Sequence, residues 1–505
     1  MTLLLSAAQM REIERDAMES GRASGADLME RAGRGVVDAL RLARPDLRPG
    51  RAVVLCGPGN NGGDGYVVAR HLRARGWDVA VHAMAGLSAL SGDARANAAR
   101  WEGVVRPIDA PLDPRCDLIV DALFGTGLGR PVEGLSDLFA RVNDARALTV
   151  ALDLPSGICA DSGRVLTSGR GQGPFAIRAD LTFAFHAPKR GHVLASGPDH
   201  CGRVVVVDIG LDGTEDPSIA RRTEGPDPAR LRKRADAHKF DHGHLMVLAG
   251  GVGRGGAARM GARAALRIGA GLVTLGVPPA ALIENAGHLD AIMLARIDDA
   301  DALTARLEDD RLNALLLGPG LGLDDRAAAL VRATLEAGRA TLLDADALSL
   351  IARDPSLRAR VHDRCVLTPH MGEFARLFPD QARGLDAPAT SGPAFSAIDA
   401  ALAAADGIGA TILLKGAATV VADPSGKVRV NAATGGEAVP WLATAGAGDV
   451  LSGIVAGLLA RGVAPPDAAA TGAWLHAGAA RAFGPGLIAE DLPDMLPRVL
   501  ADLGV

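Results

Sequence analysis

Residues 51–70 read RAVVLCGPGNNGGDGYVVAR, and this stretch decides the fold of the first part of the chain. The apolar run 51–56 predicts a buried strand, and a helix-like stretch follows the glycine-rich loop GPGNNGGDG. In that loop Asn60, Asn61 and Asp64 supply directed hydrogen bonds, while the glycines let the backbone come close to a ligand. A strand, a loop and a helix N-terminus in this order predict a phosphate or dinucleotide site.

A tight turn without a ligand is the alternative interpretation of this loop, because Asn-Gly and Gly-Asp pairs are ordinary turn residues. The loop also differs from the G-x-G-x-x-G fingerprint and from the Walker loop with its Lys-Ser/Thr ending, so neither mechanism transfers to it. The surrounding sequence is therefore needed to decide between a turn and a binding site.

Strands and helices alternate on both sides of this loop. Two amphipathic helices are expected within residues 7–42. Strand-like runs lie at 52–56, 78–83, 117–121, 148–153 and 203–208. This alternation predicts a parallel sheet with helices on both faces. Polar loops follow three of these strands, and the carboxyl ends of parallel strands meet at one edge of a sheet. We therefore expect one shared pocket that contains Asn61, Asp121, Asp153 and Ser156.

The chain has 505 residues, a length that predicts two large domains. Its apolar share of 48%, charged share of 22% and net charge of −5 are typical of a soluble globular protein and give no obvious nucleic-acid footprint. The five cysteines are far apart in the sequence, so they are expected to be reduced rather than metal-bound. No apolar stretch is long enough to cross a bilayer, and a cytoplasmic enzyme is expected.

The polar segment 216–235 is the best candidate for a linker between a first domain, residues 1–215, and a second domain, residues 236–505. A new strand at 244–249 opens a second alternating pattern. Three further glycine-rich loops follow predicted strands: GGVGRGGAA at 250–258, GPGLG at 318–322 and KGAAT at 415–419.

The most informative motif of the second half is ATAGAGD at 443–449, which directly precedes the apolar helix-like stretch VLSGIVAGLLA. Gly446 and Gly448 let successive amides point into one concavity at the positive end of that helix, where a transferring phosphoryl group is stabilised. Asp449 is placed to accept a hydroxyl proton. The alternative is that Asp449 only stabilises the helix N-terminus through the helix dipole.

Several motifs together point to a family. ATAGAGDVLSG at 443–453 resembles the anion-hole motif of the ribokinase-like superfamily, and TPHMGEFARL at 368–377 with LLDADALSL at 342–350 resembles the ADP/ATP-dependent NAD(P)H-hydrate dehydratases. In the first half, GNNGGDG, DALFGTGL, DLPSG and PKRG resemble the NAD(P)H-hydrate epimerases. The motifs cover nearly the whole chain in the order of bifunctional bacterial NAD(P)H-hydrate repair enzymes. The resemblance implies an α/β fold, with a Rossmann-like parallel-sheet domain followed by a ribokinase-like α/β domain.

The activity that this resemblance implies is repair of reduced nicotinamide cofactors that have gained water across the C5=C6 double bond. The epimerase interconverts the R and S epimers at C6. The dehydratase phosphorylates the C6 hydroxyl of the S epimer with ADP and then eliminates phosphate, which gives NAD(P)H, AMP and phosphate. The implied cofactors are K⁺ in the first domain and Mg²⁺ with ADP in the second.

For the dehydratase, the resemblance implies Asp449 as the catalytic base and an anion hole formed by Gly446, Ala447 and Gly448. The implied nucleotide-binding residues are Lys415, Gly416, Ala417, Ala418, Thr419 and Gly448. The positions that line the hydrate site in the family correspond to Ala257, Gly322, His370 and Asp449. A purely structural role for His370 is the alternative.

For the epimerase, Asp153 is our candidate for shuttling the hydroxyl proton, because inversion at C6 requires breaking a bond at a carbon that bears both oxygen and nitrogen. The family's potassium site corresponds to Asn61, Asp121 and Ser156. The implied hydrate contacts are Asn60, Asn61, Gly62, Gly63, Asp64, Gly125, Thr126, Gly127, Leu128, Gly129, Arg130, Pro131 and Asp153. The competing account is that Asp121 and Asp153 only cap the turns that follow them.

The chain departs from the family pattern at three positions. Gly436 stands where many relatives have Asn, Ala447 stands where Thr or Ser is frequent, and His186 stands where Gly often precedes the PKxG segment. The change at Gly436 affects an expected nucleotide or substrate contact, and that at His186 puts the nearby loop geometry in doubt.

Two other functions fit parts of this pattern. A small-molecule kinase, for example of a vitamin alcohol, shares the GAGD chemistry, and a nucleotide-sensing or protein-binding module would have lost activity in one half. Small-molecule substrates and a homo-oligomer are expected, without nucleic-acid or membrane partners. The bacterial resemblance favours ADP over ATP as the phosphoryl donor.

Overall fold

The computed structural model describes residues 2–167, 176–214 and 216–505. The chain folds into two compact units. The N-terminal unit contains residues 2–220 and 387–396, and the C-terminal unit contains residues 221–386 and 397–505. The predicted domain boundary at residue 215 lies outside the described residues. The structure divides the chain between Ala220 and Arg221.

A parallel sheet forms the centre of the N-terminal unit, with the strand order β4-β3-β2-β5-β6-β7-β8. Its strands are β2 (Arg51–Cys56), β3 (Asp78–Ala83), β4 (Val104–Pro107), β5 (Leu118–Ala122), β6 (Leu148–Leu152), β7 (Leu181–Phe185) and β8 (Arg203–Val207). Leu55 is paired with Asp121, and Asp121 is paired with Ala151, so the carboxyl ends of β2, β5 and β6 lie at one edge of the sheet.

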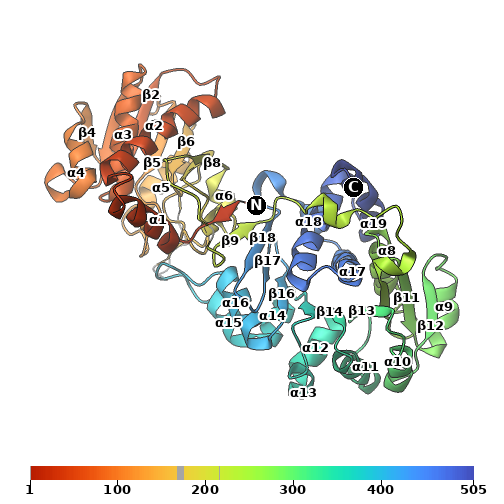
Figure 1. Ribbon diagram of the computed structural model, residues 1–505. Helices are drawn as coiled ribbons and strands as arrows, with labels where there is room; N and C mark the ends of the chain where they lie inside the picture. Colours follow the sequence, from red (N-terminus) through yellow and green to blue (C-terminus); the bar gives the residue numbers. More distant parts are fainter. Residues whose placement is uncertain (1, 168–175, 215) are drawn as a thin grey trace. The chain divides into compact units, whose positions relative to one another are not determined.

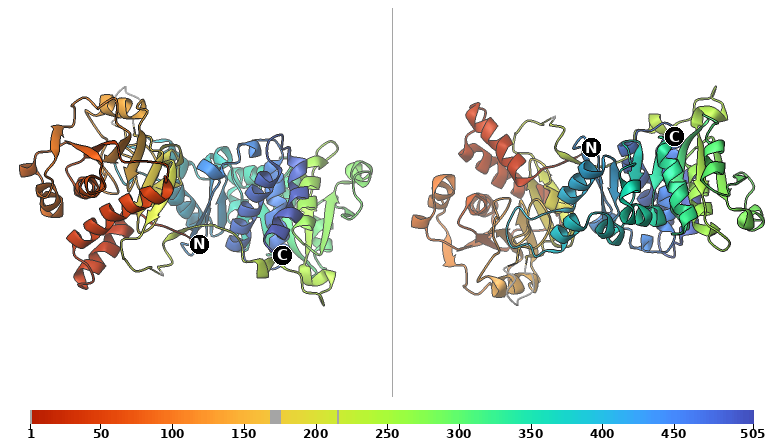
Figure 2. Two further views of the ribbon diagram at one scale, coloured as in Figure 1. Left: turned by 90° about the horizontal axis from the view of Figure 1, so that it is seen from above. Right: turned by 90° about the horizontal axis from the view of Figure 1, so that it is seen from below.

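Helices cover both faces of this sheet (Figure 1; Figure 2). They are α1 (Ala7–Glu19), α2 (Gly25–Ala43), α3 (Asn60–Ala74), α4 (Gly92–Ala99), α5 (Ser136–Asn143) and α6 (Gly197–Cys201). One apolar core joins α2 and α3 to the sheet through side chains such as Val36 and Leu72. A second core joins α5 to the opposite face through Phe139 and Val142. The expected parallel sheet with helices on both faces is confirmed.

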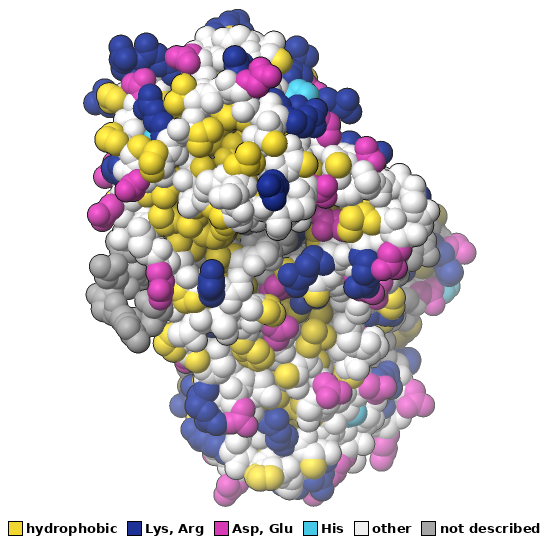
Figure 3. All heavy atoms as spheres, turned by 90° about the vertical axis from the view of Figure 1, so that its left-hand side faces the viewer, with side chains coloured by type: hydrophobic (Ala, Val, Ile, Leu, Met, Phe, Trp, Pro, Cys, Tyr) yellow, Lys and Arg dark blue, Asp and Glu magenta, His cyan; other side chains and the backbone are white. Residues whose placement is uncertain are grey.

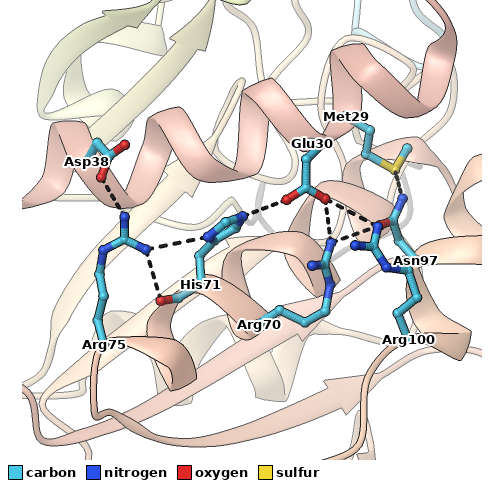
Figure 4. Close-up of polar contacts among 8 residues, drawn as sticks. All are labelled: Met29, Glu30, Asp38, Arg70, His71, Arg75, Asn97 and Arg100. Atoms are coloured by element: carbon cyan, nitrogen blue, oxygen red, sulfur yellow. Dashed lines mark hydrogen bonds and ion pairs between the residues drawn. The ribbon is translucent and has the colours of Figure 1, made fainter.

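A polar network joins three of these helices at the surface of the N-terminal unit (Figure 4). Glu30 of α2 accepts hydrogen bonds from Arg70 and His71 of α3, both at 2.7 Å. Arg70 also donates to Asn97 Oδ1 at 3.1 Å, and the Asn97 amide lies 3.2 Å from the sulfur of Met29. Asn97 belongs to α4, so the network ties α2, α3 and α4 together.

The C-terminal unit is built around a larger mixed sheet with the order β9-β18-β17-β16-β15-β14-β13-β10-β11-β12. Its strands are β9 (Ala220–Arg222), β10 (His244–Leu248), β11 (Leu272–Val277), β12 (Met293–Arg296), β13 (Leu312–Leu317), β14 (Ala340–Leu343), β15 (Cys365–Leu367), β16 (Thr411–Leu414), β17 (Ala418–Ala422) and β18 (Val428–Ala432). The strands from β16 to β12 run parallel, whereas β16, β17 and β18 are antiparallel neighbours.

The helix α17 (Ala447–Ala460) lies in the core of the C-terminal unit, and all its residues from Val450 to Ala460 are buried. It packs so closely on α8 (Gly255–Arg267) that a Cβ at Gly453 would lie 2.1 Å from the carbonyl oxygen of Gly261. The other helices are α7 (Pro228–Leu231), α9 (Leu282–Ala286), α10 (Ala300–Arg306), α11 (Asp325–Glu336), α12 (Ala345–Arg353), α13 (Pro355–Arg358), α14 (Met371–Leu377), α15 (Pro379–Asp386), α16 (Ala397–Ile408), α18 (Pro465–Phe483) and α19 (Leu492–Asp502).

Three local expectations differ from the structure. The predicted loop 57–65 is shorter than expected, because α3 already begins at Asn60. The strands β4 and β7 were not predicted. The polar segment 216–235 is also more regular than a simple linker, since it contains β9 and α7.

Charges of both signs are mixed on the surface. Figure 3 shows a face on which Lys and Arg side chains are interspersed with Asp and Glu side chains. Among the described residues, the structure contains no helix with the length and apolarity needed to span a membrane.

Candidate active sites

A cavity of about 820 Å³ lies at the carboxyl edge of the N-terminal sheet, a size typical of small-molecule sites. Most of the predicted epimerase residues form its walls, namely Asn60, Asn61, Asp64, Gly125, Thr126, Gly127, Leu128, Gly129, Arg130, Pro131 and Asp153. The predicted residues Gly62 and Gly63 lie buried in the first turn of α3, outside this set. A Cβ at Gly63 would lie 2.9 Å from the backbone Cα of Ala94, so this glycine permits the close packing of α3 on α4.

Asp153 follows β6 and projects its carboxylate into the cavity wall. Its backbone φ of 63° lies in the left-handed region, which non-glycine residues seldom adopt. One carboxylate oxygen lies 2.8 Å from Nζ of Lys189, and the other accepts a hydrogen bond of 2.7 Å from the amide of Thr126. Burial favours a raised pKa for Asp153, but the Lys189 ammonium and the Thr126 amide outweigh it and hold the pKa below its usual value. Asp153 is therefore ionised at neutral pH.

Lys189 is a site residue to which sequence reasoning gave no role, although the PKRG motif that carries it was noted. Its side chain is 0% exposed, and its ammonium also donates to the carbonyl oxygens of Phe185 and Ala187 at 2.8 and 3.1 Å. The Lys189 amide donates to Nδ1 of His192 at 2.8 Å, and Nε2 of His192 lies 2.7 Å from the carbonyl oxygen of Asp153. Burial and the nearby Lys189 lower the pKa of His192 to about 4, so its neutral ring links both residues.

The predicted potassium ligands Asn61, Asp121 and Ser156 come from α3, β5 and the loop after β6. Asp121 is fully buried and accepts hydrogen bonds from the Ser156 hydroxyl at 2.6 Å and the Ser156 amide at 2.7 Å. Burial raises the pKa of Asp121 to about 6, against the hydrogen bonds from Ser156. These donors are neutral groups, so they leave the negative charge of Asp121 uncompensated. The side-chain oxygens of Asn61, Asp121 and Ser156 therefore fit a monovalent cation.

The cavity also has a wall that the sequence did not predict. Met10, Arg11 and Glu14 of α1 line it opposite the strand ends, together with Met84 after β3. Burial and the charge of Asp153 raise the pKa of Glu14. For Asp64 the same two causes, with Glu14 as a third, raise the pKa well above its usual value. The pocket therefore combines Asp153, whose pKa is held below its usual value, with Asp64, whose pKa is shifted in the opposite direction.

His186 has the backbone conformation that a glycine would favour. Its φ is 63°, and its amide donates to the carbonyl oxygen of Val207 at 2.9 Å, which fixes the turn between β7 and the PKRG segment. The position therefore keeps the left-handed geometry in spite of the histidine, at a cost of about 1 kcal/mol.

In the C-terminal unit, Asp449 lies in the first turn of α17. Gly446 precedes the helix with φ 89°, and a Cβ there would lie 2.7 Å from the terminal carbon of Met260. The amides that follow Gly446 lie at the positive end of the helix dipole. Burial and the neighbouring Asp344 raise the pKa of Asp449 to about 6, while Lys415 acts in the opposite direction.

Lys415 is held beside Asp449 by a second carboxylate. Its ammonium lies 2.9 Å from Asp344 Oδ1, and the Ser452 hydroxyl donates to Asp344 Oδ2 at 2.7 Å. The carboxylate of Glu373 lies farther away, 3.9 Å from the ammonium. A Cβ on Gly448 would be 3.5 Å from Nζ of Lys415, so the lysine faces the predicted anion hole.

The glycine-rich loops of this unit converge through close backbone approaches. A Cβ at Gly250 would lie 2.0 Å from the carbonyl oxygen of Gly320, and one at Gly318 would lie 1.7 Å from that of Asp344. Asp344 in turn contacts Lys415 and Ser452. These contacts bring together the loops after β10, β13, β14 and β16 with the start of α17 at one edge of the sheet.

The remaining predicted dehydratase residues lie on or near these loops. His370 is the N-cap of α14, where its Nδ1 accepts a hydrogen bond from the Gly372 amide at 2.9 Å, yet its side chain is 57% exposed. The Gly322 amide donates to Asp346 at 2.8 Å, and Ala257 lies in the first turn of α8. The structural and ligand-binding roles of His370 are therefore compatible.

The predicted nucleotide loop is shorter than KGAAT. Gly416 and Ala417 follow β16, whereas Ala418 and Thr419 already belong to β17. The Thr419 hydroxyl donates to the carbonyl oxygen of Gly416 at 2.9 Å, which closes the loop. Gly436 lies in a short 3-10 helix, and a Cβ added there would meet no described atom within 4 Å. Ala447 is the first residue of α17 and is buried.

Comparison with known proteins covers both halves of the chain. Residues 25–191 match the family model of the YjeF-related protein N-terminus, and residues 245–498 match that of NAD(P)H-hydrate dehydratase. The bifunctional NAD(P)H-hydrate repair enzyme Nnr of Coxiella burnetii is 37% identical over 489 residues, which are 95% of this chain and 94% of the relative. The chain belongs to the family of bifunctional NAD(P)H-hydrate repair enzymes.

Other members and a solved structure are also similar to this chain. The bifunctional NAD(P)H-hydrate repair enzyme Nnr of Moorella thermoacetica is 37% identical over 535 residues, which are 99% of this chain and 97% of the relative. A crystal structure of the ADP/ATP-dependent NAD(P)H-hydrate dehydratase from Bacillus subtilis, co-crystallised with ATP/Mg²⁺, is 26% identical, with a TM-score of 0.45. That match covers 56% of this chain and 99% of that chain. The first family model lies within the N-terminal unit, and the second covers most of the C-terminal unit together with residues 387–396 of the N-terminal unit.

Proposed function

We propose that this chain repairs hydrated NADH and NADPH in two steps. The N-terminal unit interconverts the R and S epimers at C6, and the C-terminal unit dehydrates the S epimer with ADP to give NAD(P)H, AMP and phosphate. The observation that carries the proposal is the presence of two differently tuned aspartates, Asp153 in the cavity and Asp449 at the start of α17, in a chain of this family.

Epimerisation at C6 requires the hydroxyl proton to be bound while a bond at this carbon breaks. The ionised Asp153 accepts a hydrogen bond from the hydroxyl, and Lys189 holds its charge in place at 2.8 Å. As the hydroxyl proton passes to Asp153, the bond between C6 and ring N1 breaks to give an aldehyde, and Asp64, which lines the same cavity and has a raised pKa, donates a proton to N1. N1 then adds to the opposite face of the aldehyde carbon, returning its proton to Asp64, while the oxygen takes its proton back from Asp153. The buried Nδ2 of Asn61 lacks a hydrogen-bond partner among the described residues, so it is free to bind the hydrate.

Asn61, Asp121 and Ser156 are proposed to hold K⁺ beside this cavity. Asp121 is a fully buried carboxylate, and a cation would compensate its charge. When bound, K⁺ would supply a fixed positive charge near the hydrate. Ser156 keeps the carboxylate oriented through its hydroxyl and its amide.

Dehydration begins with proton transfer from the C6 hydroxyl to Asp449. The hydroxyl oxygen then forms a bond to the terminal phosphorus of ADP, and the bond from that phosphorus to the bridging oxygen breaks to release AMP. The phosphate leaves C6 with help from the lone pair of ring N1, and loss of a C5 proton restores the dihydropyridine. The amides from Gly446 to Gly448 would stabilise the charge on the phosphoryl group.

The donor is proposed to be ADP with Mg²⁺, bound near Lys415 and the loop 416–419. Among the described residues, no group of three His, Cys, Asp or Glu side chains could hold a metal ion. Mg²⁺ is commonly bound by phosphates with only one or two carboxylates from the protein, so the nucleotide itself would supply most of its ligands. Lys415 would exchange its contact with Asp344 for the nucleotide phosphates.

The experiment uses a mixture of both hydrate epimers with Mg-ADP or Mg-ATP, and follows the recovered absorbance of the dihydropyridine and the release of phosphate. Asp449→Asn should abolish dehydration of the S epimer and leave epimerisation intact, whereas Asp153→Asn should do the reverse. Asp325→Asn, in the exposed first turn of α11, and Asp137→Asn, in that of α5, are the matched controls. A stable phosphorylated product would instead indicate a small-molecule kinase, and survival of both activities in both variants would show that these roles are wrong.

A further inference from the structure

Residues 387–396, with the sequence APATSGPAFS, belong to the N-terminal unit although they lie inside the second half of the sequence. The chain leaves the C-terminal unit after α15, which ends at Asp386, and enters it again with α16, which begins at Ala397 (Figure 1). We call residues 387–396 the strap.

The strap contacts a wall of the epimerase cavity directly. The amide of Gly392 donates to the carbonyl oxygen of Gly129 at 3.0 Å. A Cβ added to Gly392 would lie 2.6 Å from the carbonyl oxygen of Leu128, so only glycine allows this approach. Gly129 and Leu128 both line the cavity. The strap therefore contacts the loop 125–131 without itself belonging to the residues that line the cavity.

The strap also contacts the segment that follows the DLPSG loop. The amide of Thr167 donates to the carbonyl oxygen of Ala389 at 2.9 Å, and the amide of Ala394 lies 3.4 Å from the sulfur of Cys159. The guanidinium of Arg164 donates to the carbonyl oxygens of Ala387 and Phe395. These contacts fix the strap at both ends of its length.

A small apolar cluster fills the space between the strap and the two loops. Its buried members are Leu128, Cys159, Leu166, Ala389 and Ala394. Each contact surface of the strap is formed by a small residue, which permits close approach of the backbones, while Thr390 and Ser391 are exposed on the outside. The strap thus has one packed side and one solvent side.

We propose that the strap is a positioning element of the epimerase site, so that the N-terminal unit is complete only with ten residues supplied by the dehydratase half of the sequence. This inference rests on the proposed function. Ordering the loop 125–131 costs backbone conformational entropy. The strap offsets part of that cost before substrate arrives, so the loop is held in its binding conformation. Loss of the strap raises KM more than it lowers kcat.

The test compares Ala394→Asp with Ala387→Asp in the full-length protein. The first change places a carboxylate in the apolar cluster, and the second places the same carboxylate on the exposed part of the strap. Amide hydrogen exchange of residues 125–130 and of Thr167 reports loop order without substrate. KM and kcat for epimerisation report its consequence, and dehydration of the purified S epimer checks that the C-terminal unit is intact.

For Ala394→Asp we expect exchange in the loop to become faster by about tenfold or more, and KM for the R epimer to rise by about tenfold, with kcat changed by less than about threefold. Ala387→Asp should match the parent in both measurements, and dehydration of the S epimer should be retained in both variants. Unchanged exchange in the loop, or faster exchange with unchanged KM, would overturn the proposal.

Gly392→Ala is the second variant, for the case in which Ala394→Asp unfolds the N-terminal unit. The added methyl group would push the strap away from Leu128. Gly407→Ala in α16 is the control, because a Cβ at that position would have no described atom within 4 Å. If the parent protein does not epimerise the hydrate, the proposed function fails, but the hydrogen-exchange result still decides whether the strap orders the loop.

Discussion

Replacing Lys189 with methionine tests the N-terminal site most directly, because it removes one charge of a buried pair. The ammonium lies 2.8 Å from Asp153, with the two side chains 0% and 7% exposed. In Lys189→Met the carboxylate stays buried and keeps the Thr126 amide at 2.7 Å, but it loses its cation. Leaving one partner of a buried pair uncompensated costs about 3–5 kcal/mol, so we expect that loss in the stability of the N-terminal unit.

The same change reverses the direction in which the pKa of Asp153 is shifted. Burial raises the pKa of this carboxyl, and Lys189 is the main group that lowers it below its usual 3.8. In the parent, the stability that the ionised Asp153 contributes is therefore present at neutral pH and lost only as pH falls below that usual value. In Lys189→Met the carboxyl is protonated at higher pH. The acid limb of epimerisation should then move to higher pH.

Hydrogen exchange of the β6 amides measures the local free energy of opening. Initial rates of epimerisation from pH 5 to 8 measure the shift of the acid limb. Arg75→Met is the surface control: Arg75 lies 2.7 Å from Asp38, with side chains 35% and 48% exposed, and its loss should cost about 1 kcal/mol or less. The double variant Asp153→Asn/Lys189→Met should recover most of the lost stability, since it removes both charges. If Lys189→Met lowers the free energy of opening by less than about 1 kcal/mol and leaves the pH profile unchanged, the interaction between Lys189 and Asp153 does not have the strength expected of a buried pair.

Three further predictions concern other parts of the chain. Because Asp449 must be ionised to accept a proton and its pKa is raised to about 6, kcat/KM for dehydration should fall about tenfold per pH unit below 6 and level off above it; a profile flat down to pH 5 would contradict this role. His186→Gly should raise the stability of the N-terminal unit by about 1 kcal/mol, measured by denaturant unfolding, since φ 63° then carries no strain; destabilisation would show that the side chain matters more. Arg70 and His71 contact Glu30 (Figure 4) and, against the effect of burial, lower its pKa to about 2. Glu30→Gln should therefore lower the free energy of unfolding by about 1 kcal/mol at pH 7, and this difference should disappear as pH falls from 4.5 towards 2. A difference that stays constant with pH would exclude the charge as its cause.

The sequence predicted the cavity because βα alternation has a simple geometric consequence. Asn61 and Asp153 follow buried strands and line the cavity, because parallel strands place their ends at one edge of the sheet. The expectation that Asp121 and Ser156 share this cavity is wrong: Asp121 lies within β5, and both residues are fully buried outside the cavity lining. The strand β7 was missed although LTFAF is apolar, and the edge strand β4 was missed because its residues are exposed and give no alternating pattern. Strand ends were thus easier to predict than the complete strand order.

The contacts that sequence reasoning could not supply are tertiary. Lysine is almost always a surface residue, and Lys189 is buried only because Asp153, far away in the sequence, provides its counter-ion. The strap gives a similar lesson, since a Pro-, Ala- and Gly-containing segment is typical of a surface loop. Its tertiary contacts, among them the hydrogen bonds with Gly129 and Thr167, show that it belongs to the other unit.

The position of the neighbouring lysine explains why the pKa values of Asp153 and Asp449 differ. Each aspartate lies near a lysine at a sheet edge. Lys189 forms an ion pair with Asp153, whereas Lys415 forms one with Asp344, so that Asp449 has no ion-pair partner among the described residues. The first carboxylate is therefore held ionised and suits hydrogen bonding to a hydroxyl. The second has a pKa of about 6, which suits the proposed role of a base that accepts a proton near neutral pH. Lys415→Gln should accordingly raise the pKa of Asp449 further and move the acid limb of dehydration to higher pH, measured at saturating nucleotide. A limb that stays in place would mean that Lys415 does not act on the charge of Asp449.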